Sequence, residues 1–223
     1  MSKLLSMPLV AILAIFLDIF ALAQGSLIEH KVIANFDTVP IAASGLGHYD
    51  SLIWQGISVA TSPNYLLDPH SPQNVAIVGP AQAQVVCPAR ISSKYVNSTI
   101  IQFALKSFYY GCVIPCPLSE TTGVSSTSCT TPCNITVKGY DSLENLVAQH
   151  TVVYDVVKDI TKCSTTNPKH LAMPQIVMNK DFQGLTDVTF QPESPLGEAD
   201  QLTMVFDDIY YVTDTVIGTV PTY

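Results

Sequence analysis

The sequence contains a single arginine, Arg90, and its ten lysine and arginine residues are outnumbered by eighteen aspartates and glutamates. Because a phosphate-binding surface needs a cluster of basic side chains, this composition excludes nucleic acid as a partner. Long apolar runs are also scarce, and beyond the N-terminal segment none reaches the roughly 20 residues that cross a bilayer. Motifs such as H-E-x-x-H and G-x-S-x-G and Gly-rich phosphate loops are missing. Their absence does not exclude an enzyme, but nothing in the sequence argues for one.

The N-terminal segment MSKLLSMPLVAILAIFLDIFALA has the composition of a secretory signal peptide. Lys3 supplies a short positive region, an apolar stretch follows, and Ala21-Leu22-Ala23 matches an A-x-A cleavage site. A membrane anchor is the alternative, but Asp18 interrupts the run and shortens it below the length that a bilayer requires. We therefore expect a signal peptide over residues 1–23, a single domain over residues 24–223, and an extracellular protein with no membrane span after cleavage.

The chain has six cysteines, and an even number in a secreted protein indicates a set of disulfides. They are Cys87, Cys112, Cys116, Cys129, Cys133 and Cys163. Nested bridges Cys112–Cys133 and Cys116–Cys129, with Cys87 joined to Cys163, are one arrangement. Four clustered cysteines allow about three pairings, so the connectivity stays open. Zinc binding by the two C-x-x-x-C pairs is the alternative expected of a cytosolic protein.

Two sequons predict N-linked glycosylation and agree with a secretory route. They are Asn97-Ser98-Thr99 and Asn134-Ile135-Thr136. Each lies beside a predicted strand and its connecting loop, where a glycosyltransferase has access.

Alternating apolar and polar residues, rich in β-branched side chains, dominate the remaining chain, and no long helical pattern is present. Strands are expected over residues 28–36, 52–60, 98–110, 134–141, 145–157, 185–191 and 202–212. The segments NITVKGYD and NLVAQHTVVYDVV predict a hairpin, although SLENLVAQH could instead be a short helix. Pro- and Ser-rich connections separate these strands, which together predict an all-β, two-sheet sandwich. The Ser- and Thr-rich residues 112–133 have little to bury and are expected to form a disulfide-linked loop excursion.

Alternation within two of these strands predicts which side chains share a face. In 185–191, Val188 and Phe190 lie on one face. In 98–110, the shared face holds Ile101, Phe103, Leu105 and Tyr109.

The last predicted strand, LTMVFDDIYYV, carries two adjacent carboxylates, Asp207 and Asp208, inside an apolar run. Burying a charged carboxylate is costly unless it is paired or bound to a metal. Adjacent side chains point to opposite faces of a strand, and both faces here are apolar, so alternation does not choose the inward aspartate. From Lys180 to Asp214 there are eight carboxylates against one lysine, which favours a cation as the partner. The alternative is a strand end where both carboxylates are solvated or accept backbone N–H bonds.

Aromatic side chains supply the candidate ligand-binding residues: Trp54, Tyr109 and Tyr110. An exposed aromatic ring packs against the C–H groups of a sugar, so Trp54, the only tryptophan, is a possible platform. The alternative, and the commoner role of such a residue, is a core position in its strand. Tyr109-Tyr110 places one ring on each face of its strand, which leaves one ring free for a ligand.

Three segments together resemble a group of secreted proteins, many of them fungal. The segments are ANFDTVP followed by HYDSLIWQGISV, then ITVKGYDSLENLVAQHTVVY, and finally LTMVFDDIYY. They are similar to the F-D-[DT]-[LV]-P, Y-x-x-L-x-W, V-x-G-Y-D and [FL]-D-D-[IL] motifs of that group, and residues 112–133 depart from it. The resemblance implies the galactose-binding-like jelly roll of carbohydrate-binding modules. It also implies a structural calcium, held by Asp37 from the first strand and by Asp207 or Asp208 from the last.

We therefore expect a secreted glycoprotein that acts as a non-catalytic binding module for cell-wall or surface carbohydrate. One alternative is an effector-like protein that binds a host or partner protein. The other is a polysaccharide-degrading enzyme on the same fold.

Overall fold

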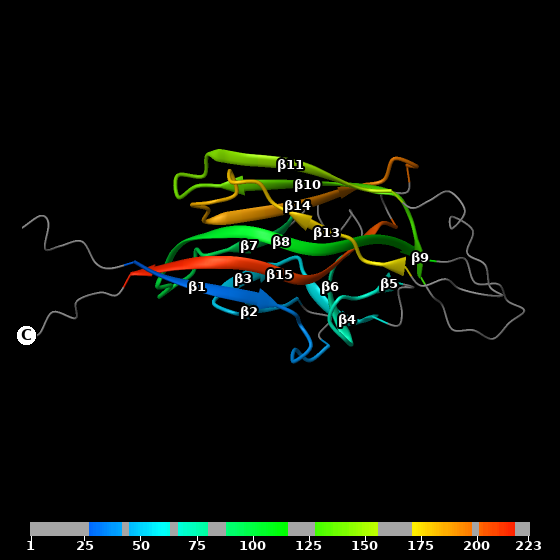
Figure 1. The fold of residues 1–223 in the computed structure, drawn as a ribbon, viewed down its shortest axis with the longest axis horizontal. Helices are drawn as coiled ribbons and strands as arrows, with labels where there is room; N and C mark the ends of the chain where they lie inside the picture. The colour runs from blue at the N-terminus through cyan, green and yellow to red at the C-terminus, as the bar shows by residue number, and fades with distance from the viewer. Residues whose placement is uncertain are drawn as a thin grey trace, which may run out of the picture.

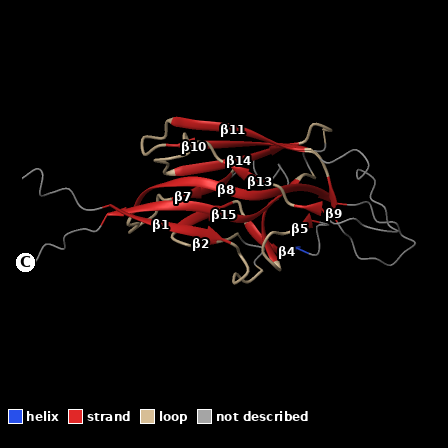
Figure 2. Ribbon diagram, viewed as in Figure 1, coloured by secondary structure: helices blue, strands red, loops and turns tan. Residues whose placement is uncertain are grey.

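The computed structural model describes residues 27–41, 45–62, 67–79, 88–115, 128–155, 171–197 and 201–216. Strands and the turns between them make up nearly all of these residues (Figure 2). The expected signal peptide, residues 1–23, lies outside the described residues. Within them, no helix is long and apolar enough to span a membrane.

One sheet has seven strands. They are β1 (Leu27–Ala34), β4 (Ser58–Thr61), β6 (Asn74–Val78), β8 (Ile100–Pro115), β9 (Ser128–Thr130), β13 (Gln175–Val177) and β15 (Thr203–Val216). The two longest strands, β8 and β15, lie antiparallel at its centre (Figure 1). On its other side β15 pairs first with β6 and then with β1, so the first and last described strands are neighbours.

The other sheet has six strands, and all of its pairings are antiparallel. In spatial order they are β11 (Leu146–Tyr154), β10 (Cys133–Tyr140), β14 (Asp187–Glu193), β7 (Ala89–Ser92), β3 (Leu52–Gln55) and β2 (Gly47–Tyr49). The two sheets enclose the core between them, and the predicted all-β, two-sheet jelly-roll sandwich is confirmed.

A short parallel pair, β5 (Leu67–Asp68) with β12 (Leu171–Ala172), lies over one end of the seven-stranded sheet. Leu67 is buried, and a Cβ added to Gly111 in β8 would lie 2.8 Å from its Cδ1 atom. Glycine at position 111 therefore lets β5 pack directly on the backbone of β8.

Aromatic side chains fill the centre of the core. Phe190 from the six-stranded sheet contacts Phe206 and Phe108 from the other sheet, with ring centroids 4.8 Å and 5.8 Å apart. Val188 is fully buried as well, so the predicted shared face of Val188 and Phe190 is confirmed. Edge-to-face packing of this kind adds about 0.5–1.5 kcal/mol per pair beyond the burial of apolar area.

The predicted shared face of β8 is correct for Phe103 and Leu105, which are both buried, and wrong for its two ends. Ile101 is 47% exposed, and Tyr109 is displaced from the core by Phe108. Two shifts in the register between β8 and β15 lie at these places. One interrupts the alternation between Leu105 and Phe108, and the other lies at Ile101, between Gln102 and Ile100.

The predicted hairpin is confirmed as β10 and β11, which pair from Cys133 opposite Tyr154 to Tyr140 opposite Leu146. The helical alternative for SLENLVAQH is therefore wrong. The Asp141 carboxylate accepts the N–H groups of Leu143 and Asn145 at the turn, and Asp favours a turn for this reason.

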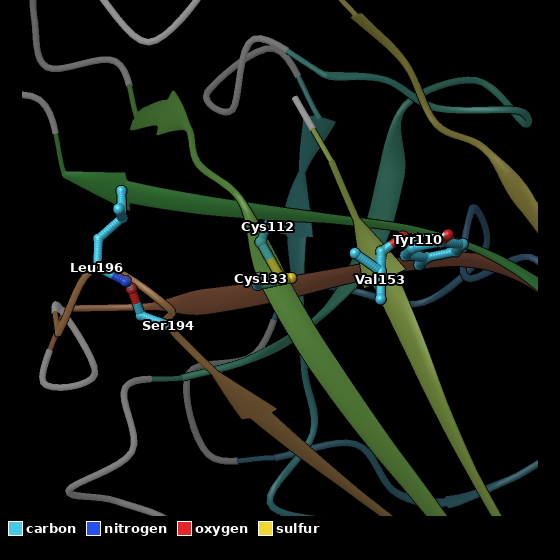
Figure 3. Close-up of a disulfide and its surroundings, with 6 residues drawn as sticks. All are labelled: Tyr110, Cys112, Cys133, Val153, Ser194 and Leu196. Atoms are coloured by element: carbon cyan, nitrogen blue, oxygen red, sulfur yellow. Dashed lines mark hydrogen bonds between the residues drawn. A yellow bond between two sulfur atoms is a disulfide. The ribbon is translucent and has the colours of Figure 1, made fainter. Parts of the chain in front are cut away.

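A disulfide joins Cys112 of β8 to Cys133 of β10 and so links the two sheets (Figure 3). One expected bridge is thereby confirmed, and Cys129 is disulfide-bonded as well. Cys87, Cys116 and Cys163 lie outside the described residues. The expected excursion over residues 112–133 is not a loop throughout, because Ser128–Thr130 pair with β8 as β9.

Candidate functional site

The two adjacent aspartates lie at a β-bulge in β15. Asp207 is opposite Tyr109 of β8, whereas Tyr210 is opposite Ser107, so β15 advances three residues while β8 advances two. Asp208 occupies the left-handed region with a φ of 43°, which Asp tolerates better than most residues. The bulge explains how two adjacent carboxylates fit into an apolar strand, because the alternation of inward and outward side chains does not continue across it.

The core-facing positions of β15 change phase at this bulge. Phe206 and Ile209 are both fully buried although they are three residues apart. Asp207 lies on the outer face of the seven-stranded sheet, beside Tyr109. It is nevertheless fully buried, because the segment between β5 and β6 covers it.

Ser71 in that segment satisfies the buried Asp207 carboxylate. Its backbone N–H donates to Oδ2 at 2.7 Å, and its hydroxyl donates to Oδ1 at 2.8 Å. The N–H of Asp208 also donates to Oδ1 at 2.9 Å. The pKa of Asp207 is raised to about 6, chiefly by burial and also by the charge of Asp208, although the bonds from Ser71 act to lower it.

Asp208 is held by a histidine of the same covering segment. Its Oδ2 lies 2.5 Å from Nδ1 of His70. The His70 ring stacks on Tyr109, with centroids 4.0 Å apart and planes inclined by 12°. Tyr109, a predicted ligand-binding residue, therefore already carries a protein ring on its face.

Asp37, the expected first-strand calcium ligand, contacts the far end of the covering segment. Its Oδ1 accepts the N–H of Asn74 at 3.1 Å, and the Asn74 amide reaches the carbonyl of Val39 at 3.2 Å. Asp37, Asp207 and Asp208 thus act as hydrogen-bond acceptors around residues 70–74. The described residues contain no group of three or more His, Cys, Asp or Glu side chains that could hold a metal ion. Calcium binding by Asp37 and by Asp207 or Asp208 stays a prediction.

Two of the predicted ligand-binding aromatics are core residues. Trp54 is 1% exposed, and its indole N–H donates to the carbonyl of Tyr49 at 2.9 Å. Tyr110 is 7% exposed, and its hydroxyl donates to the carbonyl of Val153 at 3.1 Å (Figure 3). Neither ring offers a free face to a ligand, because the alternation of their strands turns each toward the other sheet.

Polar side chains instead line the outer face of the six-stranded sheet. Asp187 of β14 lies opposite Tyr140 of β10 on one side and Ser92 of β7 on the other. One row further, Thr189 lies between Lys138 and Arg90. The residues between these positions, such as Val188 and Ile91, face the core.

Asp187 is the centre of an ion-pair network on this face. Its Oδ1 accepts Nε of Arg90 at 2.7 Å, and its Oδ2 lies 3.1 Å from Nζ of Lys94 and 3.2 Å from the hydroxyl of Thr186. Burial by itself raises the pKa of Asp187, but bonds from Ser92, Arg90 and Lys94 outweigh it and lower the pKa. The carboxylate is therefore ionised and fixed.

The network borders a shallow pocket of about 230 Å³ on the outer face. Its lining consists of Pro88, Arg90, Tyr140, Glu144, Asp187 and Thr189. Tyr140 is partly exposed there, and the Arg90 side chain is 34% exposed although Asp187 is only 3% exposed. We call this site the Tyr140 pocket.

The Tyr140 pocket was not among the predicted sites, although the sequence carried a signal for it. Arg90 is the only arginine of the chain. Asp187 and Thr189 alternate with Val188 and Phe190, so the predicted strand already placed them on the outer face. What the sequence did not contain was the pairing of β7 with β14, which brings Arg90 and Asp187 together.

The two predicted glycosylation sites differ in position. Asn97 is exposed in the turn between β7 and β8, with a φ of 65°. Asn134 is partly exposed in β10 and shares the outer face with Tyr140, six residues further along the strand. Glycosylation at both positions stays a prediction.

No protein-family model matches the chain, and no curated protein matches it. Among solved structures, a DUF4465 family protein from Bacteroides caccae has a similar fold. The TM-score is 0.50 at 11% sequence identity, and the match covers 82% of this chain and 98% of that chain. At this identity the likeness concerns the fold alone, and it extends over most of the β-sandwich.

Proposed function

We propose that this protein is a secreted, non-catalytic binding module for cell-wall or surface carbohydrate, and that the sugar binds in the Tyr140 pocket. The observation that carries the proposal is a partly exposed tyrosine beside fixed polar groups on the outer face of a sheet. Aromatic rings pack against the apolar faces of sugars, while a few well-placed polar groups orient the ligand.

The polar groups of the pocket suit hydroxyl groups. Some of the Arg90 guanidinium N–H groups donate to Asp187, and the exposed part of the guanidinium can donate to a ligand. Thr189 can donate or accept, and the ionised carboxylates of Asp187 and Glu144 accept only. Neighbouring hydroxyls of a sugar ring offer both donors and acceptors.

The charges of the pocket favour an uncharged sugar. In the ion-pair network that borders the pocket, the positive charges of Arg90 and Lys94 balance the negative charges of Asp187 and Glu144, with Nζ of Lys94 3.5 Å from Oε1 of Glu144. The buried Asp187 holds both cations, so the polar groups are ordered before the ligand arrives. Such preorganisation reduces the entropy lost on binding.

A protein partner is the second candidate, and exposed apolar side chains favour it. Leu143 is 79% exposed at the β10–β11 turn, and Leu146, Val147 and Val153 of β11 are 51%, 45% and 60% exposed. They lie on the hairpin that also supplies Tyr140. An effector-like protein would use this hairpin as its contact surface.

A screen of purified protein against immobilised glycans, followed by calorimetry with the best oligosaccharide, tests the carbohydrate proposal. We expect Tyr140→Ala to weaken binding about tenfold, because ring packing on a sugar is lost. Tyr140→Phe keeps the ring and is the matched control, which should bind like the wild type. Binding of no glycan, or equal binding by the Tyr140→Ala variant, would reject the Tyr140 pocket as a sugar site.

A further inference from the structure

A second hollow lies on the other side of the sandwich, on the outer face of the seven-stranded sheet. Lys31 of β1, Val212 of β15 and Ala104 of β8 lie side by side there. Ala104 and Val212 have short side chains, and longer ones surround them. The hollow has a volume of about 280 Å³. Its longer lining side chains are those of Glu29, Lys31, Gln102, Lys106, Gln183, Tyr210 and Asp214.

The positive groups of this hollow differ from those of the Tyr140 pocket, because they have no ion-pair partner among the described residues. Arg90 and Lys94 are both bound to Asp187. Neither Lys31 nor Lys106 forms a salt bridge within the part of the chain that the structure describes. Two ammonium groups without a salt bridge to any described residue thus lie on strands on either side of β15, in a protein whose net charge is −8.

The acidic groups occupy the opposite end of the hollow. Glu29 and Asp214 are directly opposite each other on β1 and β15, and Gln102 of β8 completes the row. The Gln102 amide donates to Oδ2 of Asp214 at 2.7 Å. The hollow therefore has a basic end, which includes Lys31 and Lys106, and an acidic end one row away.

Tyr210 adds an apolar surface to the basic end. It is partly exposed, lies opposite Ser107 next to Lys106 in β8, and is opposite Ile33 of β1. Ile33 is 60% exposed, so its side chain extends the apolar surface that the Tyr210 ring provides. A ligand that fits this end needs a negative group for the lysines and an apolar face for the tyrosine.

We propose that this hollow, the Lys31–Lys106 hollow, is a second saccharide site that binds a sugar carrying an isolated carboxylate. The carboxylate accepts bonds from the two lysines, and the sugar ring packs on Tyr210. A second anion on the next sugar would approach Glu29 and Asp214, and the net charge of the protein repels polyanions generally. The site therefore prefers a uronic acid residue within an otherwise neutral chain over a polyuronate.

The hollow is separate from the proposed neutral-sugar site, because the two lie on the outer faces of different sheets. One molecule would then hold a neutral segment on one face and an acidic branch on the other. Linking two binding sites in one rigid body raises the avidity for a polymer that displays both. The Lys31–Lys106 hollow can function even if the Tyr140 pocket binds nothing.

Calorimetry on the full chain tests the proposal with three probes. They are an oligosaccharide with one glucuronic acid residue, its neutral analogue, and a polyuronate of equal length. We expect the first to bind most tightly, with an affinity that falls as salt is added. The double variant Lys31→Met/Lys106→Met should lose roughly tenfold in that affinity, because two charge-assisted contacts are removed.

Matched variants separate this hollow from the Tyr140 pocket. Lys180→Met removes an exposed lysine from a turn outside the hollow and should leave binding of the uronate unchanged. Tyr140→Ala should also leave it unchanged. The proposal is overturned if the uronate binds no better than its neutral analogue, if the polyuronate binds best, or if the double variant binds like Lys180→Met.

Discussion

Two buried aspartates show how the surroundings of a carboxylate determine its charge. Asp187 is surrounded by the cations Arg90 and Lys94, which lower its pKa against the effect of burial. Among the described residues, Asp207 accepts bonds from the neutral donors of Ser71 and from the N–H of Asp208, and burial outweighs them, so its pKa is raised to about 6. The first arrangement fixes a permanent charge at the Tyr140 pocket, and the second stores a group that takes up a proton in mild acid.

The raised pKa of Asp207 predicts that this group stabilises the fold as the pH falls. Its folded pKa of about 6 exceeds the ordinary 3.8, so the folded state binds the proton first. Lowering the pH from 7 to 4 should raise the free energy of unfolding of the wild type relative to Asp207→Asn by about 1–3 kcal/mol. Urea unfolding at several pH values measures the difference.

The comparison is repeated in a His70→Gln background, which removes the side chain paired with the neighbouring Asp208. A wild-type minus Asp207→Asn difference that stays constant from pH 7 to pH 4 would show that Asp207 is not buried as described.

The ion-pair network around Asp187 predicts the opposite pH dependence, because its stabilising effect is lost in acid. At pH 7, Arg90→Met leaves a buried carboxylate with one cation fewer and should lower the free energy of unfolding by about 3 kcal/mol. Because the pKa of Asp187 is lowered, its stabilising charge is present above 3.8 and is lost as the pH falls further. The destabilisation should therefore shrink in acid. Lys180→Met is the control, and a loss independent of pH would contradict the network.

At the scale of a strand, the bulge in β15 restricts which residues the backbone tolerates at position 208. Asp208 has a φ of 43°, which suits glycine and disfavours β-branched residues. Asp208→Val and Asp208→Gly both remove the contact with His70, but only valine adds backbone strain. We expect the valine variant to be less stable than the glycine variant by about 1–3 kcal/mol. Equal melting temperatures of the two variants would mean that the bulge is absent.

The disulfide between β8 and β10 links the sheets at one end of the sandwich. Its cysteines are separated by 21 residues, and closing a loop of this size typically contributes about 3 kcal/mol. The double variant Cys112→Ser/Cys133→Ser should lose about 2–4 kcal/mol in chemical denaturation. If reduction and the double substitution both leave the unfolding curve unchanged, the bridge is not formed in the folded protein.

The sequence predicted the strands better than their partners. Alternation identified the faces of Val188 and Phe190 and the β10–β11 hairpin, because these depend on neighbours along the chain. The segment LIWQGISVA was expected as one strand, but Gly56, with a φ of 66°, divides it. Its halves, β3 and β4, belong to different sheets. A pattern of alternating residues contains no information about which sheet a strand joins.

At the scale of the whole molecule, the same lack of information about strand pairing explains why the sequence did not predict the Tyr140 pocket. The sequence offered Trp54, Tyr109 and Tyr110 as ligand-binding aromatics, but two are buried between the sheets and Tyr109 is covered by His70. Tyr140 was not chosen, because its role depends on the strands beside it. Partners on β7 and β14, three and four strands away along the chain, create the pocket, and only the pairing of β7, β14 and β10 reveals it.

The sandwich presents two outer faces with different chemistry. The six-stranded sheet carries an ion-paired pocket around Tyr140, and the seven-stranded sheet carries the Lys31–Lys106 hollow, whose lysines form no salt bridge within the described ranges. Both hollows border a partly exposed tyrosine. This division fits a binding module that contacts a polymer from two sides.

The most direct test of the central claim is NMR mapping of the bound sugar on isotope-labelled protein. With the best neutral oligosaccharide from the glycan screen, we expect shifted amide signals for Arg90, Tyr140 and Thr189, which lie on neighbouring strands of one outer face. Signals around Lys31 and Lys106 should stay in place. Shifts confined to other surfaces, or no shifts at saturating ligand, would contradict the claim that this face binds carbohydrate.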